Sequence, residues 1–135
     1  MKKKKWLMVV SLLIAVVIAI SLVTLTGKRP YKDLKTSDIV SATVLLGPPD
    51  KTVEIVEIKE FVALLKDVVI YNADDSYTDY AGQTVTFTLE MADGTTEKIT
   101  VCNPFIIING TGYKTKYEPC ERLDHYANEL LSRYE

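Results

Sequence analysis

Apolar and polar residues alternate most regularly between Gln83 and Cys102. A period of two residues is typical of a strand that buries one face, and Asp93-Gly94 in the middle of this segment is a strong signal for a tight turn. The apolar positions are Val85, Phe87, Leu89 and Met91 before the turn, and Ile99 and Val101 after it. The pattern predicts a β-hairpin.

Further apolar stretches predict the rest of a sheet. Residues 39–46 and 51–56 flank a proline-rich turn and predict two strands, and a short strand is predicted at 68–71. Residues 105–108 are apolar on both faces, as in a central strand, and Asn109-Gly110 then leads into a second hairpin. The strands are expected to form an antiparallel meander.

Residues 58–68 and 119–135 instead place apolar side chains three or four positions apart, which is the spacing of an amphipathic helix. The stripes are Ile58, Phe61, Val62, Leu65 and Val68 in the first helix, and Cys120, Leu123, Ala127, Leu130 and Tyr134 in the second. Pro119 suits the first turn of a helix. The predicted fold class is therefore α+β, a single domain with two helices packed on one face of an antiparallel meander.

The N-terminus shows neither the two-residue period of a strand nor the three- or four-residue spacing of an amphipathic helix. Lys2 to Lys5 precede the uncharged residues 6–25, which as a helix would be about 30 Å long, the thickness of the hydrocarbon core of a bilayer. We therefore predict a single-pass transmembrane helix that inserts residues 6–25 into the cell membrane. The lysines before it favour a cytoplasmic N-terminus and an extracytoplasmic domain.

Cleavage of this segment as a signal peptide is the alternative. Ala19-Ile20-Ser21 fits the small-x-small pattern of a cleavage site, although the apolar run continues beyond it. A cleaved chain would be secreted. In either case the sequence divides into residues 1–27, the lysine cluster with a transmembrane helix or signal peptide, a short linker at 28–37, and an extracytoplasmic α+β domain at 38–135.

The predicted domain is acidic. Six of the 16 basic residues precede Pro30, whereas all 18 acidic residues follow it, which gives the remainder of the chain a net charge of −8. A phosphate backbone is bound by a basic face, so nucleic acid is not an expected partner. A domain of about a hundred residues has room for one hydrophobic core.

Both cysteines, Cys102 and Cys120, and the only histidine, His125, lie close together in the sequence. The strand period places Cys102 on the outward face, and the helix period places Cys120 on the buried stripe and His125 on the exposed side with Glu121. This separation argues against a metal site and against a cysteine nucleophile. A bulge at Asn103-Pro104 would turn Cys102 inward, so a disulfide between the two cysteines remains open.

The polar segment "NADDSYTDYAG", residues 72–82, is the candidate binding site. Its carboxylates suit a calcium ion or a cationic peptide, and its tyrosines offer rigid contact area. Its spacing does not match an EF-hand loop, and a solvated loop without a ligand is the alternative. The candidate binding residues are Asp74, Asp75, Tyr77, Asp79 and Tyr80. The strand "GTGYKTKY" is a second candidate, although lysines also protect an edge strand.

The order of these elements resembles that of small extracytoplasmic α+β domains of Gram-positive bacteria, which are tethered by a lipid or an N-terminal helix. The resemblance is carried by "DIVSATVLLGPPDKTVEIVEIKEFVALLKDV", "VTFTLEMADGTTEKITV", "IIINGTGYKTKY" and the closing helix, and it covers residues 38–135. It implies a cell-surface module. It supplies no catalytic residue, because such domains have no established activity.

These observations predict a membrane-anchored extracytoplasmic module that binds a protein, a peptide or a cell-envelope ligand through the 72–82 loop and the adjoining hairpins. The alternative is a secreted inhibitor or immunity-type protein that acts on an enzyme. The sequence has no phosphate loop, no His-Glu-x-x-His zinc motif and no Gly-x-Ser-x-Gly motif. We therefore expect no enzymatic activity, no catalytic or metal-binding residue and no cofactor.

Overall fold

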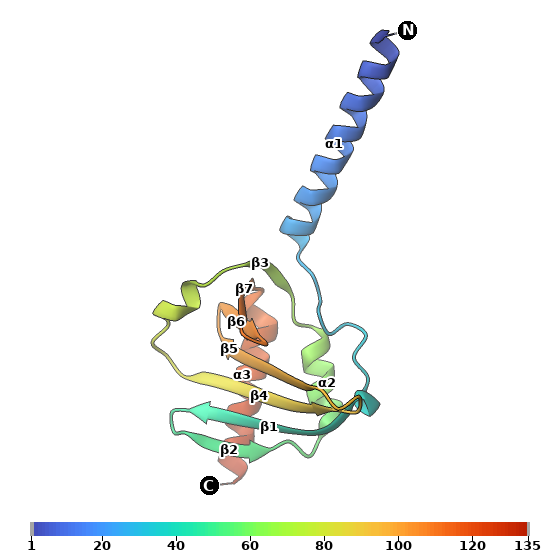
Figure 1. Cartoon of the computed structure of the whole chain (residues 1–135). Helices are drawn as coiled ribbons and strands as arrows, with labels where there is room; N and C mark the ends of the chain where they lie inside the picture. Colours follow the sequence, from blue (N-terminus) through green and yellow to red (C-terminus); the bar gives the residue numbers. More distant parts are fainter. Residues whose placement is uncertain (1, 135) are drawn as a thin grey trace.

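The computed structural model describes residues 2–134, except for the side chains of residues 2 and 21–25. Within this part of the chain, seven strands form one antiparallel sheet in the order β2-β1-β4-β5-β6-β7-β3 (Figure 1). The strands are β1 Ile39–Gly47, β2 Lys51–Glu54, β3 Ile70–Ala73, β4 Thr84–Met91, β5 Thr96–Cys102, β6 Phe105–Ile108 and β7 Thr111–Thr115. The helices are α1 Lys2–Thr26, α2 Ile58–Lys66 and α3 Tyr117–Arg133, with short 3-10 turns η1 Thr36–Asp38 and η2 Ser76–Asp79.

Helices α2 and α3 lie against one face of the sheet (Figure 1). The ring of Phe61 on α2 is central to this layer, because its centroid lies 4.9 Å from that of Phe87 on β4 and 6.1 Å from that of Tyr126 on α3. Phe61 and Phe87 are fully buried. The apolar stripes of the two helices thus meet the apolar face of the sheet, which confirms the prediction of an α+β domain.

Both predicted hairpins form. Strand β4 pairs with β5 so that Val85 lies opposite Val101 and Phe87 opposite Ile99. Strand β6 pairs with β7 through the Asn109-Gly110 turn, and both turn residues have positive φ angles, 49° and 90°. Positive φ angles at both central residues are typical of a type I′ turn, for which Asn-Gly is a preferred sequence.

The two edges of the sheet come from distant parts of the chain. Strand β1 pairs with β2 on one side and with β4 on the other. Strand β3 joins the opposite edge, where it pairs with β7 and the register shifts between Ile70 and Ala73. The segment that follows β3 is therefore held beside the β6–β7 hairpin, and this placement creates the site described below.

The predicted transmembrane helix over residues 6–25 is wrong. Among the described residues, no helix is both long enough and apolar enough to cross a membrane. Helix α1 forms, but it begins with four lysines, and the side chains of 21–25, including Ser21 of the predicted cleavage site, lie outside the described residues.

The segment after α1 is attached to the domain, while α1 itself projects away from it (Figure 1). Lys28 and Ile70 exchange two backbone hydrogen bonds, each 2.8 Å long. Tyr31 is 8% exposed, and its hydroxyl donates a 2.9 Å hydrogen bond to the Glu97 carboxylate. Burial, followed by the charge of Glu97, raises the pKa of Tyr31, so this phenol stays protonated and remains a donor.

Candidate functional site

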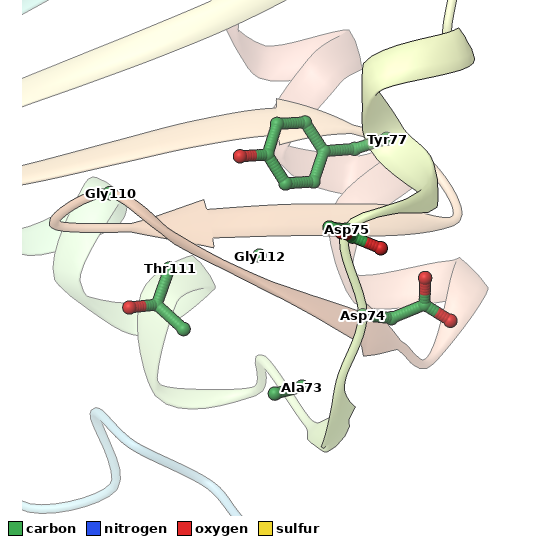
Figure 2. A pocket seen from close by; sticks show the side chains of 7 residues that line it. All are labelled: Ala73, Asp74, Asp75, Tyr77, Gly110, Thr111 and Gly112. Atoms are coloured by element: carbon green, nitrogen blue, oxygen red, sulfur yellow. The ribbon is translucent and has the colours of Figure 1, made fainter.

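A cleft of about 470 Å³ lies between the segment that follows β3 and the turn that joins β6 to β7 (Figure 2). We call it the loop-hairpin cleft. It is lined by Ala73, Asp74, Asp75, Tyr77, Gly110, Thr111 and Gly112. Three of the five predicted binding residues, Asp74, Asp75 and Tyr77, are therefore brought together here, with the hairpin as the opposite wall.

Two contacts fix the start of the 72–82 loop on strand β7. The Asp74 amide donates a 2.9 Å hydrogen bond to the Gly112 carbonyl. The ring of Tyr77 lies directly on Gly112, so a Cβ at that position would overlap the ring and come within 2.6 Å of the Asp74 carbonyl oxygen. Gly112 is therefore required by the close approach of the loop, in the way that glycine often permits two backbones to meet.

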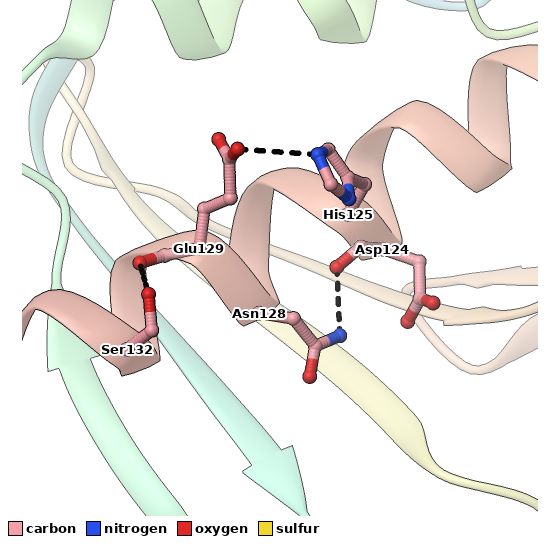
Figure 3. Close-up of polar contacts among 5 residues, drawn as sticks. All are labelled: Asp124, His125, Asn128, Glu129 and Ser132. Atoms are coloured by element: carbon pink, nitrogen blue, oxygen red, sulfur yellow. Dashed lines mark hydrogen bonds and ion pairs between the residues drawn. The ribbon is translucent and has the colours of Figure 1, made fainter. Parts of the chain in front are cut away.

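The end of the same loop is fixed on helix α3. The Asn128 side-chain amide donates a 3.0 Å hydrogen bond to Gln83, and the Gln83 amide donates back at 3.3 Å. Gln83 also donates to the Pro48 carbonyl at 2.8 Å, and Asn128 donates to the Asp124 carbonyl one turn earlier on α3 (Figure 3). Because the loop is held at both ends, its cleft is formed before any ligand arrives.

The Asp74 carboxylate already has partners within the domain. It accepts a 2.8 Å hydrogen bond from the Ser76 amide, which starts the η2 turn, and it forms an ion pair with Lys114 on β7 at 3.7 Å. The hydrogen bonds from Ser76, followed by the charge of Lys114, hold the pKa of Asp74 below its usual value. In Figure 2 the carboxylate points away from Thr111, and the other polar side chains of the lining are those of Asp75, Tyr77 and Thr111.

Asp79 and Tyr80, the remaining predicted binding residues, do not line the cleft. Asp79 is exposed at the end of η2. The Tyr80 hydroxyl donates a 2.9 Å hydrogen bond to the Gln83 carbonyl, and desolvation, then the charges of Asp124 and Cys102, raises its pKa. Tyr80 therefore links the last residues of the loop to one another.

The hairpin residues Gly110, Thr111 and Gly112 complete the site, and they belong to the second candidate, "GTGYKTKY", rather than to the five candidate binding residues. The sequence identified Asn109-Gly110 as a turn and "GTGYKTKY" as a second candidate surface, but no local pattern joins this turn to a loop some thirty residues earlier. Strand β3 makes that connection, because it pairs with β7. The second glycine of "GTG" was the available signal, since a strand-interior glycine often marks a close backbone approach.

The cysteines and the histidine do not form a site. Cys102 is only 2% exposed, so it does not face solvent as predicted, although it is not part of the core cluster either. Cys120 is fully buried beside the Thr115 hydroxyl, at 3.1 Å, and desolvation raises its pKa to about 11. Both thiols are free. A protonated, buried thiol is a weak nucleophile.

His125 lies on the exposed side of α3, as predicted, but its partner is Glu129 rather than Glu121. The ring nitrogen and the Glu129 carboxylate are 3.2 Å apart, one helical turn along the chain (Figure 3). In the described part of the chain, no three His, Cys, Asp or Glu side chains are grouped so that they could hold a metal ion.

Comparison with known proteins gives no relative to guide the assignment. No protein-family model matches the chain, and no curated protein or solved structure is significantly similar to it.

Proposed function

We propose that the domain is a binding module that recognises a peptide or protein segment, or a cell-envelope component, in the loop-hairpin cleft. One observation carries this proposal: the cleft of about 470 Å³ is built from a loop tied at both ends and lined by Tyr77, Asp75 and Thr111. Pre-formed concave sites with a few placed polar groups are the usual form of ligand sites.

The lining chemistry suits a ligand with hydrogen-bond donors or a positive charge. Asp75 offers carboxylate oxygens, and Thr111 offers a hydroxyl that both donates and accepts. The Tyr77 ring extends across the cleft with its hydroxyl toward the Gly110 turn (Figure 2). An aromatic face of this kind attracts a cation and supplies flat contact area at low entropic cost.

Site-specific photo-crosslinking tests the proposal. A photoreactive phenylalanine analogue replaces Tyr77 in the full-length protein, and the same analogue replaces Tyr117, which is 56% exposed at the start of α3, as the matched control. With a cell-envelope extract as the probe, we expect a crosslinked product at 77 that is absent at 117 and is weakened by Asp75→Asn. Equal labelling at the two positions would contradict a specific cleft.

The extracytoplasmic setting is part of the proposal, and it is supported by the lysines and apolar residues that precede the domain. A secreted inhibitor or immunity-type protein is the second setting, and it requires cleavage after Ser21. Mass spectrometry of the protein recovered from its host separates the two. A mature chain that starts at Leu22 supports secretion, and an intact lysine cluster contradicts it.

A further inference from the structure

A second concave surface lies at the other end of the domain, between the segment that joins β2 to α2 and the end of α3. Its volume is about 390 Å³, and we call it the C-terminal groove. Figure 1 shows the last turns of α3 beside strand β2 at this end of the molecule. The groove is lined by Glu54, Val56, Glu57, Leu130, Arg133 and Tyr134.

The lining combines negative charge with exposed apolar surface. Glu54 and Glu57 supply two carboxylates against the single guanidinium of Arg133. Val56 is 68% exposed and Tyr134 is 55% exposed, although both carry large apolar groups. Lysine and arginine side chains match this lining, because each has an aliphatic stem for the apolar surface and a positive charge for the carboxylates.

A buried hydroxyl on α3 has no hydrogen-bond partner in the described part of the chain. Tyr126 is 5% exposed, and its hydroxyl oxygen has no hydrogen bond to any described residue. Tyr126 lies one turn before Leu130 and two turns before Arg133, so it shares their face of α3. Polar groups buried at this depth are nearly always paired, so the hydroxyl is an unfilled hydrogen-bonding position.

Two of the three charges that act on this hydroxyl belong to the groove, although Tyr126 is not itself part of the lining. Burial, followed by the charges of Glu60 and Glu57, raises the pKa of Tyr126 to about 12, while the charge of Arg133 opposes this rise. Glu57 and Arg133 both line the groove. The hydroxyl is therefore protonated, and it is influenced by two charged groups of the groove as well as by Glu60 on α2. The Tyr126 ring stacks on Phe61.

We propose that the C-terminal groove binds an arginine or lysine side chain of an extended peptide that lies along β2. The basic group would donate hydrogen bonds to the Glu57 and Glu54 carboxylates and to the Tyr126 oxygen, while its stem packs on Val56 and Tyr134. Strand β2 ends the strand order, so it has one strand neighbour among the described residues. Peptides commonly add to such edges, with pockets that select alternate side chains. This inference goes beyond the proposed function and does not depend on it.

The test titrates the full-length protein with the peptide Ac-Val-Arg-Val-Arg-Val-NH2 and follows amide chemical shifts by NMR. We expect shifts in residues of β2 and at the end of α3. Tyr126→Phe should weaken binding about tenfold, as loss of a hydrogen bond to a charged group does, and Glu57→Gln should weaken it similarly. Glu121→Gln, on the exposed side of α3 away from the groove, is the matched control and should bind within about twofold of the wild type.

The proposal also makes a stability prediction that separates a ligand position from a structural one. If the hydroxyl waits for a ligand, Tyr126→Phe removes a buried unpaired group, and the melting temperature should stay the same or rise. The proposal is overturned if the arginine peptide does not bind, if Ac-Val-Glu-Val-Glu-Val-NH2 binds equally well, or if Tyr126→Phe binds like the wild type. A clear loss of thermal stability in Tyr126→Phe also overturns it, because the hydroxyl would then have a partner within the fold.

Discussion

The loop-hairpin cleft and the C-terminal groove are both concave and both acidic, but their polar groups are in different states. In the cleft, the Asp74 carboxylate is paired with Ser76 and Lys114. On the face of α3 that carries Leu130 and Arg133 of the groove, the Tyr126 hydroxyl is buried without a partner among the described residues. Each lining holds two acidic residues, so a count of acidic residues does not separate the two sites, whereas a count of unpaired buried groups draws attention to the groove.

This difference separates groups that build a site from groups that are available to a ligand. A carboxylate that starts a turn and forms an ion pair has already exchanged water for protein partners, and a ligand would have to displace them. An unpaired buried group gains a partner when a ligand binds. The cleft therefore depends on Asp75, Thr111 and Tyr77, and Asp74 acts as its support.

The largest expected effect comes from Gly112→Ala, which tests whether the cleft is a rigid part of the fold. A Cβ there would overlap the Tyr77 ring and press on the Asp74 carbonyl, and such overpacking typically costs about 1–3 kcal/mol. Chemical denaturation measures the loss. Gly82→Ala is the matched control, because its Cβ meets only the far end of the Tyr80 side chain. An equal loss at the two positions would mean that the loop does not rest on Gly112 as described.

A smaller effect is expected at the other end of the loop, where Gln83 and Asn128 exchange hydrogen bonds. Alanine at either position should cost about 1 kcal/mol, the usual net contribution of such a pair. The double variant should cost less than the sum of the two, because each single change already breaks the same interaction. Strict additivity in denaturant titrations would indicate that the two amides stabilise the domain independently.

The comparison also shows which features the sequence could reveal. The β4–β5 hairpin was predictable because the period of two, the Asp-Gly turn and the pairing of Val85 with Val101 are all local. The two amphipathic helices were predictable for the same reason. The acidic loop was identified by composition, and the structure brings Asp74, Asp75 and Tyr77 together but not Tyr80.

Non-local contacts account for what the sequence did not reveal. The cleft depends on pairing between β3 and β7, whose partners lie about forty residues apart and whose register is irregular. Cys102 was assigned to an outward face by strict alternation, but at the end of β5 its side chain is buried. The C-terminal groove gave no sequence signal, because the missing partner of Tyr126 is apparent only once its neighbours are in place.

The smallest effect tests whether Asp74 supports the cleft or serves its ligand. Asp93 in the β4–β5 turn is a natural reference, because its carboxylate likewise accepts a hydrogen bond from an amide two residues later, at 2.9 Å. Hydrogen bonds lower the pKa of both carboxyls. A lowered pKa in the folded state gives stability that is present above the unfolded value of about 4 and is lost as the pH falls through the folded value. Asp74→Asn and Asp93→Asn should therefore each destabilise the protein at pH 7, and each difference from the wild type should disappear in acid.

The two variants should respond differently to salt, and this response isolates the ion pair with Lys114. Only Asp74 faces that lysine, at 3.7 Å and close to the surface, where added salt screens the attraction. The stability difference caused by Asp74→Asn should shrink between low and high ionic strength, while that caused by Asp93→Asn stays nearly constant. If Asp74→Asn leaves stability unchanged at pH 7 but abolishes crosslinking at position 77, the carboxylate belongs to the ligand, and the distinction between supporting and available groups in this cleft is wrong.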